Sequence, residues 1–337
     1  MTQKTILIVT DNLKDQINGV VTTYKNIEAC ALLDGYRVVY ITPGDFRYFD
    51  CPGYNEVKIA YPRAMGEKIE EISPDYIHIA TEGPLGLSAR KYLSKHNLCY
   101  NTAYHTKFPE GLRALFGIPE ALTWPLVRWF HKHSGKVLTT TDTMVKELRD
   151  HGFDGDVIPW TRGVDRSIFS PSLRDRDDDR KVLVCVARVS KEKNLEDFFK
   201  LEYPKGRKIM VGDGPMRAEY EKSYPDVEFV GFKTGVDLAR YYANADVFVF
   251  PSCWETFGIV MIEAMACGTP VAAYPVQGPM DVVEQGVTGY MEEDLATAVH
   301  RCIGLNRDRV LEGSQRWTWE NAWKIFRDNL IEKSDTR

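Results

Sequence analysis

Two glutamates stand in a stretch of the chain that is otherwise almost entirely apolar. The stretch WETFGIVMIEAMACGTP covers residues 254–270 and holds Glu255 and Glu263, with Gly258 between them. A strand pattern, ADVFVFPS (245–252), precedes it, and IVMIEAMAC has the length and apolar circumference of a buried helix. A carboxylate inside such a helix is costly unless it has a partner. These two acids are therefore either structural ions or parts of a binding site.

The expected start of this helix, near Gly258 and Ile259, suits an anion. Free amides at a helix N-terminus bind phosphate, and glycine lets a phosphate approach the backbone. A diphosphate bound there would place an attached ribose near Glu263, whose carboxylate can accept hydrogen bonds from vicinal hydroxyls. Glu255 would then face the group on the other side of the diphosphate. The structural alternative is that Glu255 caps the helix and Glu263 pairs with a buried Lys or Arg.

Two cations and a glycine follow other strand patterns. Arg188 and Lys193 lie just after the strand expected in KVLVCVARV (181–189), where they could neutralise a leaving diphosphate. The guanidinium of Arg can form paired hydrogen bonds to a phosphate, whereas the ammonium of Lys acts as a point charge. Gly19 lies in a tight loop after the first strand pattern, where a side chain would obstruct a bound diphosphate or sugar. The structural alternatives are that Arg188 and Lys193 are solvated surface charges and that Gly19 is an ordinary turn glycine.

Composition indicates a soluble globular protein. The 337 residues suggest two domains, and 44% hydrophobic with 27% charged residues is an ordinary balance. A net charge of -5 gives no overall attraction to nucleic acid or anionic membranes, although a local basic face remains open. The seven cysteines show no zinc-type spacing, and no signal-like or membrane-spanning segment is visible. We expect a cytoplasmic protein, with peripheral contact to a membrane left open.

The strand patterns alternate with segments of helical spacing, which predicts an α/β fold. We expect two doubly wound halves facing across a cleft, with ligands outside the carboxyl ends of the strands. A charge run at 173–181 reads as a solvated linker. The expected division is therefore an N-terminal domain at 1–172, a C-terminal domain at 181–316 and a closing helix at 317–335. The principal strand patterns lie at 5–10, 37–42, 76–81, 136–141, 181–189, 208–214, 227–232, 245–252 and 269–275.

These motifs together resemble those of the retaining glycosyltransferases with two Rossmann-like domains, the GT-B fold, and most closely glycosyltransferase family 4. Glu255 and Glu263 have the E-x7-E spacing of that family. The branch with the closest resemblance contains bacterial diacylglycerol glycosyltransferases and sulfolipid synthases. The other matching segments are QINGVVTTY (16–24), IHIATEGPLG (77–86), AYHTKFPEG (103–111), WTRGVDRSIFSP (160–171), VARVSKEKNLE (186–196), VGDGP (211–215) and the tail WTWENA.

The resemblance implies roles for individual residues. His105 would reach the donor sugar near the scissile bond, although a satisfied core histidine is the alternative. The tail helix would return to pack on the first domain. The implied catalytic residues are His105, Glu255, Arg188 and Lys193. The implied donor-binding residues are Gly19, Arg188, Lys193, Gly212, Glu255, Phe257, Gly258, Ile259, Val260 and Glu263. The acceptor-side candidates are Glu82, Lys107, Arg113 and Arg128.

The reaction implied is transfer of a hexose-type or pentose sugar from a nucleoside diphosphate with retention of anomeric configuration. A UDP-sugar is favoured and a GDP-sugar is the other option. We expect a front-face displacement in which a phosphate oxygen takes the acceptor's proton, with no metal and no cofactor. The alternatives are a sugar-nucleotide-binding module without transfer, or an epimerase or phosphorylase of the same fold.

The resemblance favours a lipid as the acceptor, and a hydroxylated DNA base or a saccharide remains open. The segment 107–136 interleaves aromatic residues with lysines and arginines. It could lie on a membrane or bind nucleic acid, or it could be a core helix with a solvated basic edge. DGD (154–156) and Asp165 are expected to be turn residues rather than metal ligands or catalysts. The segment 194–210 is short for the family and predicts a clipped helix.

Overall fold

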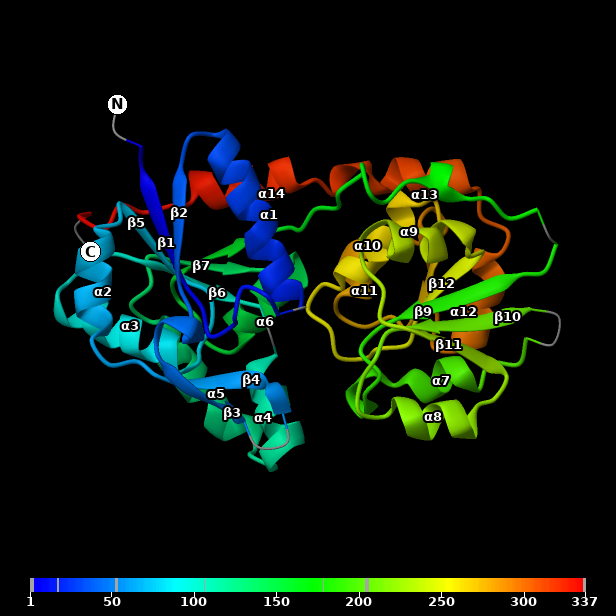
Figure 1. The fold of residues 1–337 in the computed structure, drawn as a ribbon, viewed down its shortest axis with the longest axis horizontal. Helices are drawn as coiled ribbons and strands as arrows, with labels where there is room; N and C mark the ends of the chain where they lie inside the picture. The colour runs from blue at the N-terminus through cyan, green and yellow to red at the C-terminus, as the bar shows by residue number, and fades with distance from the viewer. Residues whose placement is uncertain are drawn as a thin grey trace. The chain divides into compact units, whose positions relative to one another are not determined.

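The computed structural model describes residues 3–16, 18–51, 54–105, 107–177, 179–203 and 206–335 (Figure 1). The chain divides into two compact units. The first unit is Met1–Arg162 with Trp319–Arg337, and the second is Gly163–Thr318. Ile17 of the glycine loop, Thr106 of the segment after His105 and Asp178 of the charge run lie outside the described residues.

The first unit is built on a six-stranded sheet with the order β2-β1-β5-β6-β7-β8, in which all neighbours are parallel. Its strand β1, which lies between β2 and β5, is buried along its whole length, which explains the run of apolar and β-branched residues. The strands are β1 (Thr5–Val9), β2 (Arg37–Ile41), β5 (Tyr76–Ile79), β6 (Asn101–Tyr104), β7 (Lys136–Thr139) and β8 (Asp156–Pro159). The helices are α1 (Gly19–Leu33), α2 (Met65–Ile72), α3 (Pro84–Lys95), α4 (Phe108–Phe116), α5 (Glu120–His131), α6 (Asp142–Asp150) and α14 (Trp319–Asp328).

The second unit has its own six-stranded parallel sheet, with the order β11-β10-β9-β12-β13-β14. The order reverses between β9 and β12, and in the first unit between β1 and β5, so each sheet has a switch point. The strands are β9 (Val182–Val186), β10 (Arg207–Val211), β11 (Val227–Gly231), β12 (Val247–Phe250), β13 (Val271–Ala273) and β14 (Gly289–Met291). The helices are α7 (Leu195–Phe199), α8 (Arg217–Ser223), α9 (Gly235–Asn244), α10 (Ile259–Ala266), α11 (Pro279–Val282), α12 (Leu295–Cys302) and α13 (Arg307–Gly313).

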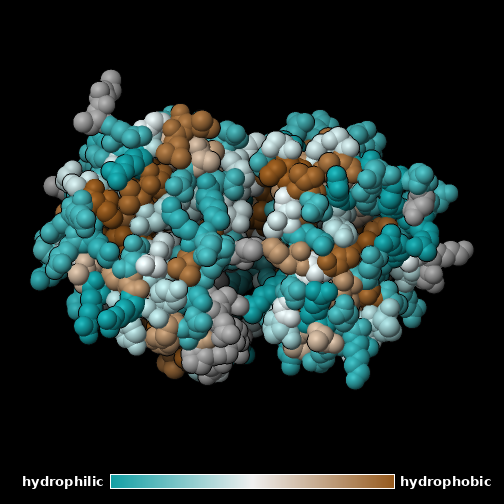
Figure 2. Space-filling model, in the orientation of Figure 1, coloured by the Kyte–Doolittle hydropathy of each residue, from teal (hydrophilic) through white to brown (hydrophobic). Residues whose placement is uncertain are grey.

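The expected α/β class with two doubly wound sheets is confirmed, and the clipped helix between β9 and β10 is the five-residue α7. An antiparallel hairpin of β3 (Arg47–Cys51) and β4 (Tyr54–Tyr61) is an element that sequence reasoning missed. Its first strand is mostly exposed, so it carries none of the buried apolar run that marks the sheet strands. Hydrophilic residues cover most of the face seen in Figure 2, with small hydrophobic patches between them.

The first unit ends at Arg162, ten residues before the expected boundary at 172. The reason is packing, because Val164 and Phe169 belong to the core of the second unit. Arg166 also donates hydrogen bonds to the carbonyl and hydroxyl oxygens of Ser314 in that unit. The boundary therefore follows tertiary contacts that no local composition change announces.

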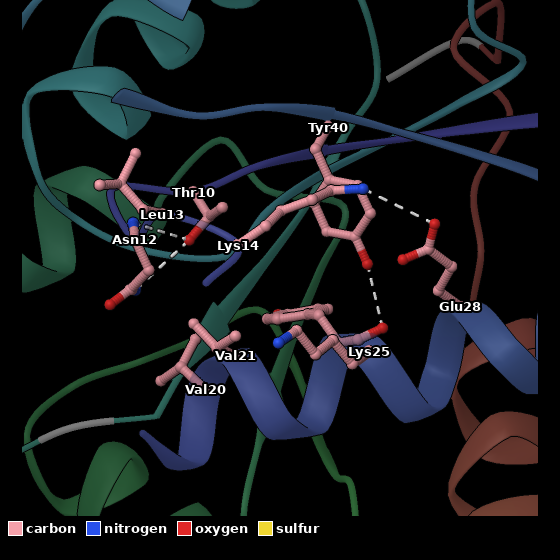
Figure 3. A pocket seen from close by; sticks show the side chains of 10 residues that line it. Thr10, Asn12, Leu13, Lys14, Val20, Val21, Lys25, Glu28 and Tyr40 are labelled. Carbon is pink, nitrogen blue, oxygen red and sulfur yellow. Dashed lines mark hydrogen bonds and ion pairs between the residues drawn. The ribbon is translucent and has the colours of Figure 1, made fainter. Parts of the chain in front are cut away.

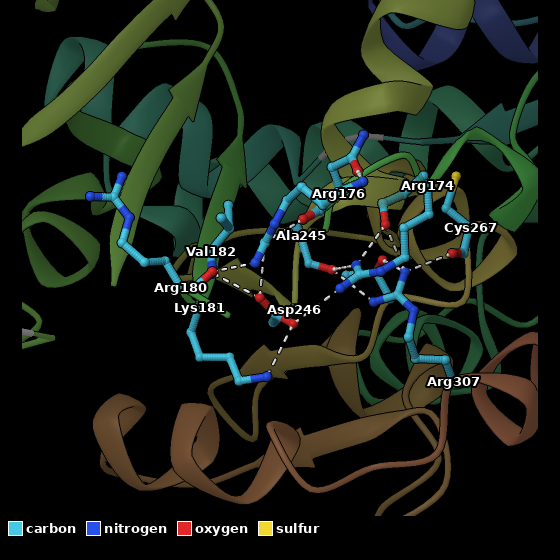
Figure 4. A network of polar contacts seen from close by, with 12 residues as sticks. Arg174, Arg176, Arg180, Lys181, Val182, Ala245, Asp246, Cys267 and Arg307 are labelled. Carbon is cyan, nitrogen blue, oxygen red and sulfur yellow. Dashed lines mark hydrogen bonds and ion pairs between the residues drawn. The ribbon is translucent and has the colours of Figure 1, made fainter. Parts of the chain in front are cut away.

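The expectation of a solvated linker at 173–181 is wrong for Arg174 and Arg176. Arg174 donates to the carbonyl oxygens of Ala243 and Ala245, and Arg176 to the oxygens of Asn244 and Asp246. In Figure 4 these side chains and Arg307 point toward the end of α9. The last carbonyls of a helix have no partner within it, and cations are favoured there. The segment is thus anchored to the second unit by helix capping.

The helix α14 packs against α1 in the first unit. Trp323 Nε1 and Arg327 Nη1 both donate to Asp34, at 3.0 and 2.9 Å. Trp160 Nε1 donates to the carbonyl oxygen of Ala322, so the end of β8 is also tied to this helix. These contacts place the end of the chain within the first unit. The helix itself spans Trp319–Asp328, shorter than the 317–335 expected.

Candidate functional site

The neighbouring strands β9 and β12 carry charged side chains just beyond their carboxyl ends. Arg188 and Lys193 follow β9, and Glu255 follows β12. Lys193 Nζ lies 3.0 Å from Glu255 Oε2, and both side chains are 25% exposed. The charge of Glu255 raises the pKa of Lys193, whereas the positive charge of the exposed Arg188 opposes this shift. Three of the residues expected at a donor site therefore interact electrostatically at the switch point of the second sheet.

The turn into α10 depends on Gly258. Its φ of 81° lies in the left-handed region, and a Cβ there would come 2.7 Å from Met261 Cε and 3.3 Å from Phe250. Ile259 and Val260 form the first turn of the helix, as expected. The helix has no side-chain cap, so the expectation that Glu255 might cap it is not what the structure shows.

Phe257, expected among the donor-binding residues, has its ring in the core of the second unit. The ring is 3% exposed and packs edge-on against Trp317 at a centroid distance of 5.3 Å. This ring can support the loop before α10, but its face is occupied. Only the backbone of Phe257 can approach a ligand.

Glu263 lies one turn into α10 and accepts a hydrogen bond of 3.1 Å from the hydroxyl of Tyr242, which belongs to α9. Burial raises the pKa of Glu263 to about 7, and the Tyr242 hydrogen bond only partly opposes the shift. In the described part of the chain Glu263 forms no ion pair, so the expected buried Lys or Arg partner is not seen. Among the described residues, the hydrogen bond from Tyr242 engages one of the two carboxylate oxygens, Oε2.

Gly212 has a structural reason for its type. A Cβ at this position would lie 1.9 Å from the carbonyl oxygen of Ala187, and its φ is 144°. The loops after β9 and β10 are joined here by hydrogen bonds from Ala187 N to Val211 O and from Val189 N to Asp213 O. Gly212 therefore brings the loop that carries Arg188 close to its neighbour, which is an indirect contribution to the candidate site.

In the first unit, Gly19 is exposed and is the first residue of α1, which Asn18 caps through a hydrogen bond from Val21 N. A small cleft lies beside this helix at the carboxyl ends of β1 and β2 (Figure 3). Lys14 Nζ lies 3.8 Å from the ring centre of Tyr40 and 3.7 Å from Glu28. The lining residues are Thr10, Asn12, Leu13, Lys14, Val20, Val21, Tyr24, Lys25, Glu28 and Tyr40.

His105 follows β6 and is 8% exposed. Its Nδ1 lies 2.9 Å from Arg162 Nη2, and its Nε2 lies 2.8 Å from the hydroxyl of Tyr24. Burial, and then the charge of Arg162, hold the pKa of His105 well below its usual range. The His105 ring therefore behaves as the alternative of a satisfied core histidine predicts. A sugar could contact either ring nitrogen only by displacing Arg162 or Tyr24.

The four acceptor-side candidates do not converge on one point. Lys107 lies 3.6 Å from Glu147 and 3.9 Å from Glu110, and Arg113 lies 3.0 Å from Glu120. Glu82 Oε1 lies 3.4 Å from His131 Nε2, but neither atom forms a hydrogen bond among the described residues. Arg128 Nη1 donates to the carbonyl oxygen of His151. The three basic side chains therefore each have a partner in their own neighbourhood of the first unit.

The helix α5 has two apolar faces. Trp124, Val127 and Phe130 are buried, which agrees with the core-helix alternative for 107–136. Leu122, Leu126 and Trp129 are 69%, 46% and 48% exposed and follow the spacing of one helix face. This outer face is an apolar surface that a core helix alone would not require.

The described residues offer neither a metal centre nor a membrane-spanning helix. They contain no cluster of three or more His, Cys, Asp or Glu side chains that could hold a metal ion. In the same residues, no helix is long and apolar enough to cross a bilayer. Asp165 accepts hydrogen bonds from the backbone and hydroxyl of Ser167, the turn role expected for it.

Sequence reasoning missed the partners of the key side chains. Tyr242 is 21 positions from Glu263, and Arg162 is 57 positions from His105. Arg162 stands in the matching segment WTRGVDRSIFSP, so its presence was visible but its contact was not. Tyr24 ends the segment QINGVVTTY, where only the glycine was singled out.

Both halves of the chain match known glycosyltransferase families. Residues 17–168 match the description "Glycosyltransferase Family 4", and residues 170–301 match "Glycosyl transferases group 1". A GDP-mannose-dependent alpha-mannosyltransferase of Mycolicibacterium smegmatis is 30% identical over 287 residues, covering 80% of this chain and 75% of the relative. The chain therefore belongs to glycosyltransferase family 4, with the GT-B fold that this membership implies.

Other relatives and a solved structure agree with this membership. Sulfoquinovosyl transferase SQD2 of Arabidopsis thaliana is 29% identical over 84% of this chain, which spans 62% of that relative's length. Alpha-monoglucosyldiacylglycerol synthase of Acholeplasma laidlawii is 26% identical over 94% of this chain and 92% of the relative. The fold is similar to that of sucrose-phosphate synthase from Thermosynechococcus elongatus, with a TM-score of 0.81, 20% identity and 97% of this chain covered against 99% of that one. The expected branch of glycolipid and sulfolipid enzymes is thus represented among the relatives.

Proposed function

We propose that this chain transfers a sugar from a nucleoside diphosphate to an acceptor hydroxyl with retention of anomeric configuration. The observation that carries the proposal is the Lys193–Glu255 pair just before α10, with the partly satisfied carboxylate of Glu263 one turn inside that helix. A diphosphate at the start of α10 would meet the helix amides and the cations Arg188 and Lys193. Glu263 would accept hydrogen bonds from the ribose.

Donor binding would exchange partners at this site. Lys193 and Glu255 neutralise each other, and with 25% of each side chain exposed a ligand can reach both. A diphosphate offers Lys193 more negative charge, and sugar hydroxyls offer Glu255 hydrogen-bond donors. The site can therefore remain neutral before binding and redistribute its charges when the donor arrives. Arg188 and Lys193 would then stabilise the charge that develops on the leaving group.

The sugar is a hexose or pentose carried by UDP or GDP. A UDP-sugar was the expectation from the motifs, and relatives named GDP-mannose-dependent alpha-mannosyltransferases add weight to GDP. Their alpha products, formed from donors that are themselves alpha-linked, are consistent with retention. We propose a front-face displacement without a metal ion, in which a phosphate oxygen accepts the proton of the acceptor hydroxyl.

A lipid is the acceptor that we favour, because relatives include an alpha-monoglucosyldiacylglycerol synthase and because α5 exposes Leu122, Leu126 and Trp129. An apolar helix face flanked by cations such as Lys132 can lie in the headgroup region of a membrane. A saccharide is the second option. The comparisons offer no support for a hydroxylated DNA base.

The test incubates the protein with UDP-, GDP- and ADP-sugars, each with diacylglycerol vesicles, an oligosaccharide or hydroxymethylated DNA. We expect release of nucleoside diphosphate, an alpha-linked glycolipid by NMR, and full activity in EDTA. A beta-linked product would contradict retention, and activity lost in EDTA and restored by a divalent cation would contradict metal independence. Binding without release would indicate a sugar-nucleotide-binding module, and an isomerised donor would indicate an epimerase.

A further inference from the structure

Four polar side chains form a continuous buried chain of hydrogen bonds through the first unit. Arg162 Nη2 lies 2.9 Å from His105 Nδ1, His105 Nε2 lies 2.8 Å from Tyr24 Oη, and Tyr24 Oη lies 2.7 Å from His78 Nε2. The four residues are between 0% and 8% exposed. They come from α1, β5, the end of β6 and the last residue of the unit's first segment. Of the four, only His105 was among the residues expected at the active site from the sequence.

The direction of this chain follows from the chemistry of its first member. A guanidinium has five N–H donors and no acceptor, so Arg162 can only donate and His105 Nδ1 must accept. A neutral imidazole carries its proton on the other nitrogen, which makes His105 Nε2 a donor to the Tyr24 oxygen. The Tyr24 hydroxyl then has its own proton left to donate to His78 Nε2. His78 must in turn carry its proton on Nδ1.

The opposite direction is chemically excluded. If His78 Nε2 donated to Tyr24 and Tyr24 donated to His105 Nε2, both nitrogens of His105 would be acceptors. That ring would be an imidazolate, which does not form at neutral pH. A third arrangement, in which both histidines donate to the Tyr24 oxygen, would leave both the buried Tyr24 proton and His78 Nδ1 without a partner among the described residues, which is costlier than one unpaired group. Arg162 thus determines the tautomer of His105 and, through Tyr24, favours the Nδ1 proton on His78.

The arginine is itself held firmly. Its Nη1 donates to the carbonyl oxygens of Trp160 and Thr161, and its guanidinium lies 4.6 Å from the ring centre of Trp160. Burial lowers the pKa of Arg162 to about 10, so it remains cationic at neutral pH. At the other end of the chain, His78 Nδ1 is buried without a hydrogen-bond partner among the described residues, and the His78 ring packs edge-on against Phe326. A chain of hydrogen bonds that starts with donation from Arg162 ends in an N–H group at His78 Nδ1, which is the unpaired atom.

The electrostatic surroundings also favour neutral rings. The charged or titratable groups that act on His105 are Arg162, His78 and His131, and all three oppose its protonation. Burial alone lowers the pKa of His78 to about 3. Protonation of His105 would require Nδ1 to give up its bond to Arg162.

We propose that Arg162 and Tyr24 are positioning residues that hold His105 as a neutral ring with its proton on Nε2. Arg162 selects the tautomer, and Tyr24 fixes the orientation of the ring. His105 therefore takes no part in proton transfer during the reaction and serves as a rigid group. The kinetic consequence rests on the proposed function, whereas the tautomer does not.

The tautomer is tested by 15N NMR of the full chain labelled at histidine, with H105N and H78N used for assignment. In the wild type we expect a pyridine-type resonance for His105 Nδ1 and a pyrrole-type resonance for His105 Nε2, unchanged from pH 5.5 to 8. His78 should show the reverse pattern. In R162M we expect His105 to move its proton to Nδ1 and His78 to gain an Nε2 proton. Y24F should leave the His105 tautomer intact and change only the His78 resonances.

A matched control is R90M, which also removes a buried arginine of the first unit. Arg90 donates to the carbonyl oxygens of Trp129 and Phe130. We expect R90M to leave the tautomers unchanged. An Nδ1-protonated His105 in the wild type, titration of that ring between pH 5.5 and 8, or an unchanged His105 in a folded R162M would overturn the proposal.

The kinetic arm measures donor turnover against pH. We expect R162M to lower kcat about 10- to 100-fold, the range for losing one charged hydrogen bond, with a much smaller change in the donor KM. An acid limb should appear in kcat for R162M and be absent in the wild type, and R162K should recover most of the rate. Turnover with the wrong tautomer would defeat this inference alone. Correct tautomers in a protein that turns over no donor would defeat the proposed function alone.

Discussion

The carboxyl edges of the two sheets handle polar groups in opposite ways. At the first sheet, His105 and Tyr24 are buried, neutral and bound to each other. At the second sheet, Lys193 and Glu255 form an ion pair with a quarter of each side chain exposed, and Glu263 has one tyrosine as a partner. The first edge is committed to internal contacts, whereas the second can exchange its contacts for those of a ligand.

Energetics explain why this difference matters for function. The Lys193–Glu255 pair is partly exposed, so a diphosphate can separate its two side chains at a lower cost than a fully buried pair would require. A buried polar group left without its partner costs about 1–3 kcal/mol, so the chain from Arg162 to His78 resists rearrangement. The second edge is therefore suited to binding and the first to fixing geometry. Each prediction below breaks one side of this contrast.

The largest effect is expected from Glu255→Gln. Loss of the carboxylate removes an acceptor for the sugar and leaves Lys193 without its partner, so we expect kcat to fall about 10²- to 10³-fold, as for other preorganised electrostatic groups. The melting temperature should hardly change, because the pair is partly exposed. The measurement is nucleoside diphosphate release under saturating donor.

The control for this variant is Glu228→Gln, which breaks an ion pair with Arg207 on the outer strands of the same sheet. It should leave turnover within twofold of the wild type, a margin of about 0.4 kcal/mol. Equal losses in both variants would mean that Glu255 has no special place in catalysis.

The second effect concerns the loops that carry the cations. Gly212→Ala places a Cβ 1.9 Å from the carbonyl oxygen of Ala187, so the loop after β9 must shift. We expect a loss of about 2–3 kcal/mol in the free energy of unfolding, measured by denaturant titration, together with weaker donor binding. Gly235→Ala is the comparison, since its φ is also positive but no atom lies within 4 Å. Gly235→Ala should lower the free energy of unfolding by about 1 kcal/mol. Equal losses in the two variants would show that backbone strain, and not the contact with Ala187, governs the effect at Gly212.

The third effect contrasts the edges directly. Tyr24→Phe removes the central hydroxyl between His105 and His78, and we expect a loss of about 1–2 kcal/mol in unfolding free energy. Lys193→Met, at the partly exposed pair, should cost less than Tyr24→Phe does. Chemical denaturation of both variants measures the difference. A larger loss for Lys193→Met would reverse the distinction drawn between the two edges.

The smallest effect is a pH dependence centred on Glu263, whose pKa is raised to about 7 by burial. If its carboxylate accepts ribose hydrogen bonds, donor affinity should weaken as the pH falls below 7, by less than about tenfold between pH 8 and 6. The effect belongs in kcat/KM, which reports the free enzyme, and Glu263→Gln should abolish it. A profile unchanged by that substitution would remove Glu263 from the ribose site.

The pH dependence of the unfolding free energy provides an independent check on Glu263, because its sign is opposite to that of the donor affinity. The folded state holds the Glu263 proton more tightly than the unfolded state does, because the pKa rises from 4.5 to about 7. The stabilisation from this group is therefore present at low pH and is lost as the pH rises through about 7. Glu263→Gln should flatten that part of the curve of unfolding free energy against pH.

Much of the fold was predictable, because both sheets consist of buried strands whose apolar runs are visible in the sequence. The β3–β4 hairpin was not, since its exposed strand lacks such a run. The anchoring of Arg174 and Arg176 to the end of α9 was also hidden, because helix capping by a distant segment leaves no local pattern.

The candidate site likewise contains residues that the sequence indicated and residues that it did not. Glu255, Arg188 and Lys193 were found because residues just beyond parallel strands share one edge of the sheet. Tyr242 and Arg162 were missed. Tyr242 contacts the carboxylate of Glu263, and Arg162 contacts the imidazole of His105, only because the tertiary fold brings distant segments together. Phe257 was assigned to the donor from its place in a motif, although its apolar ring is satisfied by the core.

The most direct test of a donor site at the edge of the second sheet is calorimetric titration with UDP and GDP. We expect the wild type to bind at least one of them, and Lys193→Met to bind it at least tenfold more weakly. Lys181→Met, which removes a lysine paired with Asp246 in the same unit, should bind as the wild type does. Failure of the wild type to bind either nucleotide, or equal weakening in both variants, would contradict the account.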